Sequence, residues 1–192
     1  MKTQVILASA SPRRAELLRQ AGIEPEIVPS QVTEVITSAE PEAVVKELSA
    51  QKAEDTAGHF MGQDAVVIGA DTVVSAEGQI LGKPKDREDA CRMIRMLAGK
   101  EHQVYTGVTL ISCRDGRRYT FAEKTEVSVY PMTEEEIGEY VDTKESMDKA
   151  GAYGIQGYFA AYIYKICGDY NNVVGLPLGR VCRELKNLLN TR

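Results

Sequence analysis

The sequence lacks the long apolar run that a membrane-spanning helix requires. No window of its 192 residues approaches the ~20 consecutive apolar residues of such a helix, so we expect no membrane segment. The apolar run near the N-terminus is not followed by a small-residue cleavage site, so we also expect no signal peptide. Hydrophobic residues still make up 43% of the chain, which is enough for one sizeable domain or two small lobes.

Closely spaced cysteines and histidines are also missing. The four cysteines, which are far apart and form neither a zinc-knuckle nor a CxxC pattern, are Cys91, Cys113, Cys167 and Cys182. We therefore expect free thiols and a cytoplasmic location. The two histidines, His59 and His102, have no ligand spacing and are interpreted as non-catalytic. The sequence thus offers no zinc site, no Ser-His-Asp triad and no Cys-His nucleophile.

An excess of positive charge is absent as well. The net charge is -5, from 23 Lys and Arg against 28 Asp and Glu. Proteins that bind duplex nucleic acid non-specifically neutralise its phosphates with many cations. We therefore expect no stable nucleic-acid partner. A phosphorylated ligand would need cations gathered locally, or a metal ion.

The sequence does contain an alternation of strands and helices. Apolar, β-branched runs predict strands near 4–9, 26–28, 64–70, 103–113, 117–130 and 159–166. Helical spacing and capping residues predict helices near 12–21, 41–57, 86–98 and 133–142, and from 177 onwards. Turns at 77–78 and 115–116 predict two hairpins, and 168–172 is interpreted as a further turn. The order predicts an α/β protein with a mixed sheet.

The most informative segment is 5–14, where a buried strand leads through small hydroxyl residues into a helix. Ser11 suits the N-cap of this helix and Pro12 suits its first position. A helix N-terminus favours anions because its N–H groups are unpaired and carry a partial positive charge. Arg13 and Arg14 strengthen this tendency, since guanidinium groups bind phosphate oxygens through two hydrogen bonds. The alternative is a capped helix with two solvated arginines.

Asp71 follows the apolar run 64–70, at the edge where open α/β sheets bind ligands. A carboxylate in this place holds Mg²⁺ or activates a water molecule. The alternative is a helix cap or a turn residue. No helical pattern follows Asp71, which favours the functional interpretation.

Two lysines and one acid are weaker candidates. Lys83 lies between Gly82 and Pro84 and is either a phosphate contact or a solvated loop residue. Lys52 lies among apolar residues of its helix and either points inward or extends to water. Glu34 is isolated in a polar loop and indicates little by itself.

The segment 148–157 places three glycines around Tyr153 and Gln156. Glycines allow the backbone to approach a ligand closely. Gln156 can donate and accept hydrogen bonds at the same time, which suits the edge of a nucleobase. The alternative is an ordinary irregular loop. The apolar residues of 171–178 are interpreted as core.

Six segments together resemble the Maf family of nucleoside triphosphate pyrophosphatases. They lie in order over almost the whole chain: 9–14, 69–74, 81–86, 105–108, 148–157 and 168–178. The resemblance implies an inosine-triphosphatase-like fold of the Maf/Ham1 type in one domain, 1–192. This fold has a long, curved mixed sheet flanked by helices, with two lobes around a cleft. The resemblance also favours a homodimer.

The reaction that the resemblance implies is hydrolysis of a nucleoside triphosphate to the monophosphate and pyrophosphate, with Mg²⁺ or Mn²⁺. Asp71 corresponds to the family's proton acceptor and, with Glu34, to its metal site. The positions that correspond to phosphate-binding and substrate-binding residues are Ser9, Arg13, Arg14, Lys52, Thr72, Lys83 and Gln156. One departure is Val32-Thr33-Glu34, where the family pattern has an acidic pair.

Arg13, Thr72 and Gln156 match the branch of the family that prefers dTTP and UTP, with a role in nucleotide-pool sanitation or cell-division arrest. One alternative is another substrate, either 7-methyl-GTP or an inosine-type triphosphate. A second is a nucleotide-binding division inhibitor without turnover, which the presence of Asp71 disfavours because a pure binder needs no base. Whether Asp71 acts as a base or as a metal ligand stays open.

Overall fold

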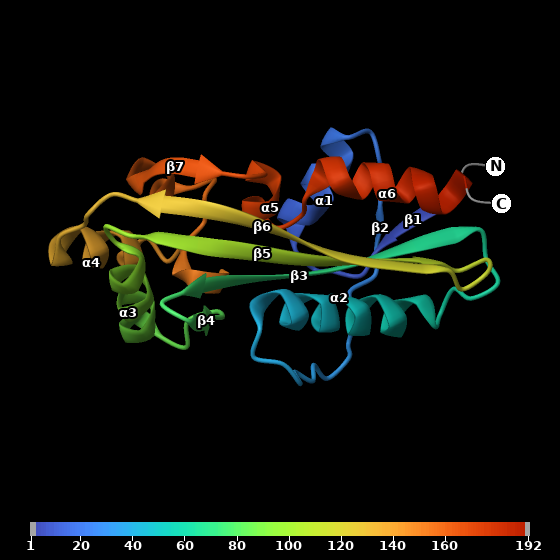
Figure 1. The fold of residues 1–192 in the computed structure, drawn as a ribbon, viewed down its shortest axis with the longest axis horizontal. Coiled ribbons are helices and arrows are strands. Elements are labelled where there is room, and N and C mark those ends of the chain that lie inside the picture. Colours follow the sequence, from blue (N-terminus) through green and yellow to red (C-terminus); the bar gives the residue numbers. More distant parts are fainter. Residues whose placement is uncertain (1–2, 191–192) are drawn as a thin grey trace. The chain divides into compact units, whose positions relative to one another are not determined.

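The structure of the protein, a computed structural model, describes residues 3–190 (Figure 1). The strands are β1 (Gln4–Leu7), β2 (Glu26–Ile27), β3 (Ala65–Ala76), β4 (Gln79–Leu81), β5 (Glu101–Ser112), β6 (Arg118–Val129) and β7 (Ile163–Cys167). The helices are α1 (Pro12–Gln20), α2 (Pro41–Ala57), α3 (Arg87–Leu97), α4 (Glu134–Asp142), α5 (Tyr170–Val174) and α6 (Leu178–Asn190). Among the described residues, no helix combines the length and the apolar character needed to cross a bilayer.

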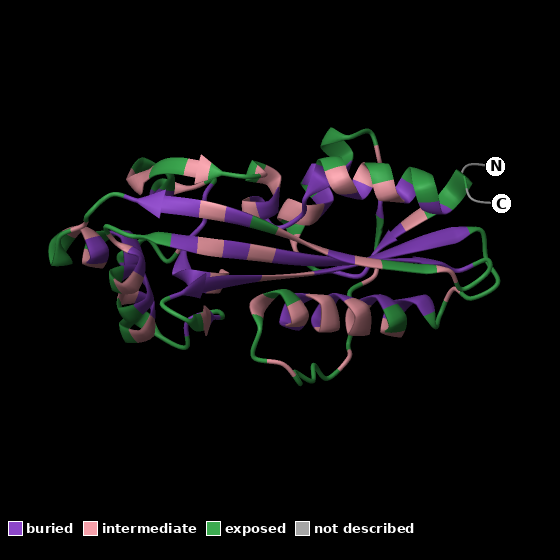
Figure 2. Cartoon of the chain, viewed as in Figure 1, coloured by how far each residue is buried: buried purple, intermediate pink, exposed green. Residues whose placement is uncertain are grey.

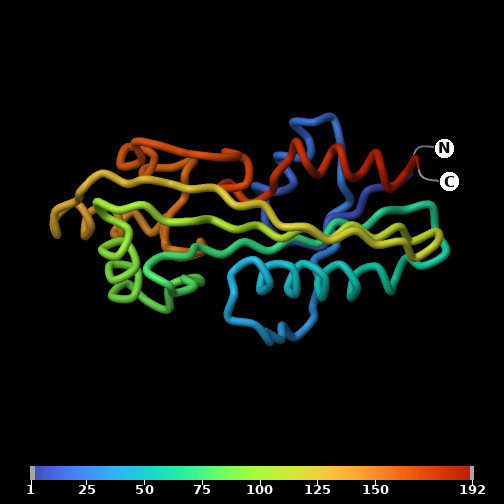
Figure 3. Tube along the Cα trace, viewed as in Figure 1, coloured from blue at the N-terminus to red at the C-terminus, as the bar shows by residue number. Residues whose placement is uncertain are grey.

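The strands form one seven-stranded mixed sheet in the order β2-β1-β3-β5-β6-β7, with β4 paired to β3. β1 is parallel to both β2 and β3, and Leu7 lies opposite Ile68. β3 and β4 are antiparallel, as are β6 and β7. β5 and β6 are neighbours joined by the predicted 115–116 turn, and the chain path of this hairpin can be followed in Figure 3. The prediction of an α/β protein with a mixed sheet is confirmed.

The chain divides into two compact units. Unit 1 comprises Met1–Asp71, Thr106–Glu123 and Gly175–Arg192. Unit 2 comprises Thr72–Tyr105 and Lys124–Val174. The long strands β3, β5 and β6 contribute residues to both units.

In unit 1, α2 packs on β3 and β5 with no side chain between the helix and the strands at two positions. A Cβ atom on Gly69 would lie 2.7 Å from the backbone nitrogen of Ala53. A Cβ atom on Gly107 would overlap the carbonyl group of Val45. Glycine is required at both positions because any larger residue would push the helix away from the sheet.

Unit 1 also contains α6, which lies on the opposite side of these strands from α2 (Figure 1). The helix predicted from 177 onwards is confirmed as α6, and its apolar stripe is buried: Leu178, Val181, Leu185 and Leu188. Arg180 places its guanidinium 4.4 Å from the centre of the Phe121 ring and donates a hydrogen bond to the Ala122 carbonyl. Figure 2 shows mostly buried residues in the strands and exposed residues on the outer faces of the helices.

In unit 2, the predicted helices near 86–98 and 133–142 are confirmed, and both begin at capping residues. Asp86 precedes α3 and accepts a hydrogen bond from the Asp89 backbone N–H at 2.8 Å. Thr133 and Glu136 form a capping box at the start of α4. Because these caps pair N–H groups that the helix itself leaves unpaired, they define where both helices begin.

The core of unit 2 contains an aromatic cluster with a neutral histidine beside it. The Phe159 ring is fully buried and lies 4.7 Å from the Tyr153 ring and 4.9 Å from the Tyr140 ring. His102 is also buried, with Nε2 2.8 Å from the Tyr153 hydroxyl. Burial lowers the pKa of His102 to about 4. A neutral, enclosed ring of this kind has a core role, in line with the non-catalytic interpretation.

The strand predicted at 159–166 begins later than the sequence indicated. β7 starts at Ile163, and Tyr158–Tyr162 form a 3₁₀ turn instead. The prediction was wrong because the apolar character of Phe159 comes from its place in the aromatic cluster and does not reflect strand alternation.

The turn predicted at 168–172 was also wrong in part. Residues Tyr170–Val174 form the short helix α5. Its start is stabilised by Asp169, whose carboxylate accepts a hydrogen bond from the Asn171 N–H at 2.8 Å. The neighbouring Asn172 is buried, and its side-chain amide donates to the Val104 carbonyl at 3.1 Å.

We expect Gly107→Ala to lower the free energy of unfolding by about 2–3 kcal/mol, because the added methyl group forces α2 and β5 apart. The matched control is Gly179→Ala in α6, where a Cβ atom meets nothing within 4 Å. That change should be neutral or stabilise the protein by up to about 1 kcal/mol, since alanine favours a helix. Urea unfolding measures both. Equal stability of the two variants would contradict the close packing of α2.

Candidate active site

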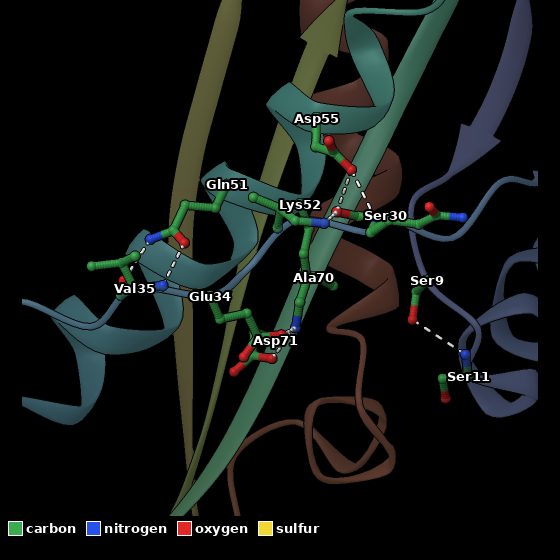
Figure 4. Close-up of polar contacts among 12 residues, drawn as sticks. Ser9, Ser11, Ser30, Glu34, Val35, Gln51, Lys52, Asp55, Ala70 and Asp71 are labelled. Atoms are coloured by element: carbon green, nitrogen blue, oxygen red, sulfur yellow. Dashed lines mark hydrogen bonds and ion pairs between the residues drawn. The ribbon is translucent and has the colours of Figure 1, made fainter.

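Two carboxylates and one ammonium group meet beside β3. Lys52 of α2 donates a hydrogen bond to Asp71 Oδ1 at 2.5 Å, and its Nζ lies 2.9 Å from Glu34 Oε1. The Lys52 and Asp71 side chains are 18% and 16% exposed, whereas that of Glu34 is 46% exposed. Figure 4 shows Glu34 and Asp71 close together beside the strand. The structure thus brings three of the predicted residues into one ion-paired cluster.

Asp71 lies inside β3, so the prediction that it ends a strand is wrong. The strand continues because Val73 and Val74 are β-branched and buried, and Val74 pairs with Leu81 of β4. The neighbouring parallel strand β1 ends at Leu7, opposite Ile68 of β3. Asp71 therefore lies beyond the carboxyl end of β1. The edge that open α/β sheets use for ligands is here defined by β1, and β3 runs past it.

The loop that carries Glu34 is held by polar side chains of α2. The Gln51 amide accepts a hydrogen bond from the Val35 N–H at 2.9 Å and donates one to the Val35 carbonyl at 2.6 Å. Asp55 accepts a hydrogen bond from the Ser30 hydroxyl at 2.7 Å. These contacts, drawn in Figure 4, lie on both sides of Glu34 in the sequence. They restrict the position of Glu34, although its side chain is half exposed.

A third side chain of α2, Glu47, extends this set of contacts toward the end of the loop. Its carboxylate accepts hydrogen bonds from the Thr37 hydroxyl at 2.6 Å and from the Thr37 N–H at 3.0 Å. The hydrogen bond from Ser30 lowers the pKa of Asp55, and the hydrogen bond from Thr37 lowers the pKa of Glu47. Both carboxylates are therefore ionised acceptors for the loop at neutral pH.

Arg14 connects three separate segments of unit 1. Its Nη1 donates hydrogen bonds to Ser9 Oγ and to the Ala70 carbonyl, both at 3.0 Å. Its Nε donates to the Gly175 carbonyl at 2.8 Å. Ala70 immediately precedes Asp71 in β3. Arg14 therefore fixes the loop before α1 and the residues after α5 next to the strand that carries the acid.

Burial and neighbouring charges influence the pKa of Arg14. Burial lowers the pKa of the Arg14 guanidinium, the negative charge of Asp71 opposes this effect, and the positive charge of Arg13 adds to it. An arginine remains protonated under such conditions because its ordinary pKa is so high. Asp71 and Arg13 thus both lie close enough to Arg14 to act on it electrostatically.

The N-terminus of α1 begins as predicted, with Ser11 as the N-cap residue and Pro12 at the first helical position. The Ser11 side chain makes no capping hydrogen bond within the described structure, and the first turn contains no acidic residue. Ser9 instead accepts a hydrogen bond from the Ser11 N–H at 3.3 Å. No carboxylate of the first turn therefore offsets the partial positive charge of this helix end.

Three further predicted residues, Thr72, Lys83 and Gln156, belong to unit 2. Thr72 follows Asp71 directly in β3, and both Lys83 and Gln156 are exposed. The Gly82 carbonyl accepts a hydrogen bond from the Gly151 N–H at 3.0 Å, which joins the loop of Lys83 to the glycine-rich segment. The part of these three residues in substrate binding stays a prediction.

The three glycines of 148–157 have a role that the sequence analysis did not predict. A Cβ atom on each would clash with a protein side chain: Gly151 with Val74, Gly154 with Lys149, and Gly157 with Glu145. The space that each missing side chain leaves is therefore filled by the protein itself. These glycines are thus required for close packing within unit 2, and the close approach of a ligand to them stays a prediction.

The acids of the cluster fit a divalent metal that arrives with phosphate groups. Mg²⁺ is usually bound by one or two carboxylates together with substrate phosphates. Glu34 and Asp71 supply two carboxylates, and both already contact the same cationic group, Lys52. Within residues 3–190, no three or more His, Cys, Asp or Glu side chains gather as a metal cage. The donor set therefore suits a metal shared with the substrate.

A profile of the Maf-like protein family matches residues 4–188 of this chain. The chain belongs to the Maf family. Curated relatives of this Maf protein include the dTTP/UTP pyrophosphatase of Agathobacter rectalis, which is 55% identical over 97% of this chain and 98% of the relative. That of Carboxydothermus hydrogenoformans is 50% identical over 95% and 97%, respectively. The Ham1 protein of Staphylococcus aureus has a similar fold, with a TM-score of 0.51 and 13% identity over 84% of this chain and 80% of that chain.

Sequence reasoning missed the residues that hold the Glu34 loop of this Maf protein. Glu47, Gln51 and Asp55 are four residues apart, which places them on one face of α2. This spacing was a usable signal, since it marks a polar stripe beside the apolar one. The Gly175 carbonyl that accepts from Arg14 gave no comparable signal, because every residue carries a carbonyl.

We expect Gln51→Ala to loosen the loop that carries Glu34, because it removes both hydrogen bonds to Val35. Hydrogen exchange at the Val35 amide should accelerate about fivefold, because the loss of one typical hydrogen bond lowers the free energy of local opening by a corresponding amount. Mass spectrometry or NMR can measure this exchange. Lys46→Ala is the control on the same helix, because Lys46 is paired with Glu42 and not with the loop. Unchanged exchange at Val35 in Gln51→Ala would rule out this anchoring.

Proposed function

We propose that this Maf protein is a hydrolase of acid anhydrides that converts dTTP and UTP to the monophosphate and pyrophosphate. Relatives that are 46–55% identical over nearly the whole chain are named dTTP/UTP pyrophosphatase. The observation that carries the proposal in this chain is the cluster of Asp71, Lys52 and Glu34 in unit 1. The two acids can bind a metal ion or accept a proton, and the neighbouring lysine can bind phosphate.

The cations of unit 1 support a triphosphate as substrate. The triphosphate carries several negative charges, and an acidic protein must gather positive groups to bind it. Arg13 and Arg14 lie in the first turn of α1, whose N–H groups add a partial positive charge. Lys52 adds a further cation beside Asp71. In this proposal Ser9 and Lys83 also bind phosphate oxygens.

The chemistry requires a water molecule aligned with the phosphate anhydride that breaks. As the oxygen of this water molecule bonds to a phosphorus atom of the anhydride, Asp71 accepts a proton from the water. The bond between the α- and β-phosphates then breaks. Lys52 holds the Asp71 carboxylate at 2.5 Å and thereby fixes the direction in which it accepts the proton. Pyrophosphate leaves, with its charge offset by the neighbouring cations.

Glu34 and Asp71 would hold a Mg²⁺ or Mn²⁺ ion together with the phosphate oxygens. When bound, such an ion neutralises the phosphate charge and stabilises the leaving group. Arg13, Thr72 and Gln156 select the base in this proposal. A cytoplasmic location is supported by the four free cysteine thiols. The homodimer stays a prediction from the family resemblance.

Pyrophosphate release from a panel of nucleotides tests the proposed function. Purified protein with Mg²⁺ or Mn²⁺ should release pyrophosphate from dTTP and UTP, and EDTA should abolish the reaction. The panel also contains 7-methyl-GTP and inosine triphosphate, so that a preference for either reveals a different substrate class. Release of inorganic phosphate with a nucleoside diphosphate would refute the reaction type. Binding of dTTP without turnover would identify a nucleotide-binding protein instead.

We expect Asp71→Asn to lower kcat by about 10²–10⁴-fold, the usual contribution of a positioned general base. The amide keeps the shape of the side chain and removes its charge. Asp64→Asn serves as the control, because Asp64 is an exposed acid that precedes the same strand. The Mg²⁺ concentration for half-maximal rate is measured in parallel, and a marked increase would identify Asp71 as a metal ligand. A folded Asp71→Asn protein with wild-type turnover would exclude a catalytic role.

We expect Gln156→Glu to change base selection without altering the phosphate chemistry. The amide pairs with the N3–H donor and a carbonyl acceptor of uracil or thymine, whereas a carboxylate can only accept. An unpaired polar group costs about 1–3 kcal/mol, or roughly one to two decades in kcat/KM. The kcat/KM values for UTP and dTTP should therefore fall, and those for GTP and 7-methyl-GTP should rise relative to them. An equal loss for all four substrates would assign Gln156 to the loop or the phosphates.

A further inference from the structure

A glutamate that follows α4 supports the loop that carries Gln156. Glu145 Oε2 accepts a hydrogen bond from the Tyr158 N–H at 2.9 Å. A Cβ atom on Gly157 would overlap this carboxylate. Glycine at this position thus allows the glutamate to reach the backbone just after Gln156.

The other side of Gln156 is supported in a similar way by Lys149. A Cβ atom on Gly154 would lie 2.6 Å from Lys149 Cε. The Lys149 ammonium group donates a hydrogen bond to the Glu145 carbonyl at 2.5 Å. Gln156 itself is exposed, but Gly154 and Gly157 on either side of it both pack against the turn that contains Glu145 and Lys149.

Support by a carboxylate has an unfavourable effect on the stability of the folded state. Glu145 Oε1 is buried and has no hydrogen-bond partner among the described residues. A buried acceptor without a partner lowers the stability of the folded state. Filling the same space with an apolar side chain would avoid this loss but would leave the Tyr158 N–H without this acceptor. The feature that an apolar residue would lack is the hydrogen bond from the Tyr158 N–H.

We propose that Glu145 is a positioning residue for base selection, which holds Gly154–Tyr158 so that Gln156 meets the pyrimidine base in a fixed orientation. The inference rests on the proposed function, in which Gln156 recognises the base. Glu145 touches neither the base nor the phosphates in this role. It acts through the backbone on both sides of Gln156, and it makes the loop a preorganised recognition element.

The test compares Glu145→Ala with Glu145→Gln and with the exposed control Glu139→Ala on α4. Glu145→Ala should raise KM for UTP and dTTP about tenfold, the effect of one lost hydrogen bond to a charged acceptor, and leave kcat nearly unchanged. The kcat/KM for GTP should not change, because GTP does not use the selected orientation. Glu145→Gln keeps an acceptor for the Tyr158 N–H and should restore selectivity, and Glu139→Ala should behave as wild type.

The coupling between the two residues decides the proposal. In a Gln156→Ala background, Glu145→Ala should have no further effect on kcat/KM for UTP. An additive loss, an equal loss for UTP and GTP, or an unchanged KM would each overturn the positioning role. If Glu145→Ala does not fold by circular dichroism, Glu145→Asp takes its place, since it keeps the charge and shortens the reach.

Failure of the proposed function would be recognised separately. If the wild-type protein releases no pyrophosphate from any nucleotide, the reaction is refuted independently of Glu145. The same set of variants is then compared by calorimetry for the dissociation constant of UTP. Loss of the coupling between Glu145 and Gln156 in that measurement would overturn the inference, and its presence would support it for nucleotide binding. Absence of UTP binding to the wild type would overturn both.

Discussion

The close approach of α2 to the sheet is the constraint on which the candidate site depends. Gly69 and Gly107 leave no side chain between the helix and the strands, so the helix backbone lies almost in contact with β3 and β5. Asp71 is two residues beyond Gly69 in the same strand, and Lys52 precedes Ala53, which touches Gly69. A larger residue at Gly69 would carry Lys52 away from Asp71, because lysine already spans the gap with a 2.5 Å hydrogen bond. Gly69 therefore determines both the packing of α2 on the sheet and the contact between Lys52 and Asp71.

The helix also determines where the third member of the cluster lies. Its apolar face is buried against the sheet, and its polar stripe of Glu47, Gln51 and Asp55 holds the loop that brings Glu34 to Lys52. A loop without secondary structure is usually mobile because few contacts restrain it. Here, one helix supplies both the cation and the restraints of the loop.

Much of the fold followed from local patterns. The caps of α3 and α4, the stripe of α6 and both hairpin turns were predictable because each depends on residues close in sequence. The continuity of β3 through Asp71 was not, since the polar Asp71 and Thr72 interrupt the apolar pattern between the predicted strand and the predicted 77–78 hairpin. At the site, residue types and family resemblance named Asp71, Lys52 and Glu34, but their ion pairs required the fold. The roles of Gly154 and Gly157 were missed because the residues that fill their space act through tertiary packing.

The cluster around Lys52 contains two negative charges and one positive charge before any ligand enters. The lysine is thus a counter-ion shared by the two acids, which offsets their mutual repulsion. In the proposed function, a metal-bound nucleotide exchanges one set of counter-ions for another at this cluster. Binding of this kind is governed by charge balance and by the ionic strength of the medium more than by ordering of the polypeptide. A lysine between two acids thus holds the loop of Glu34 to β3 by charge as well as by hydrogen bonds.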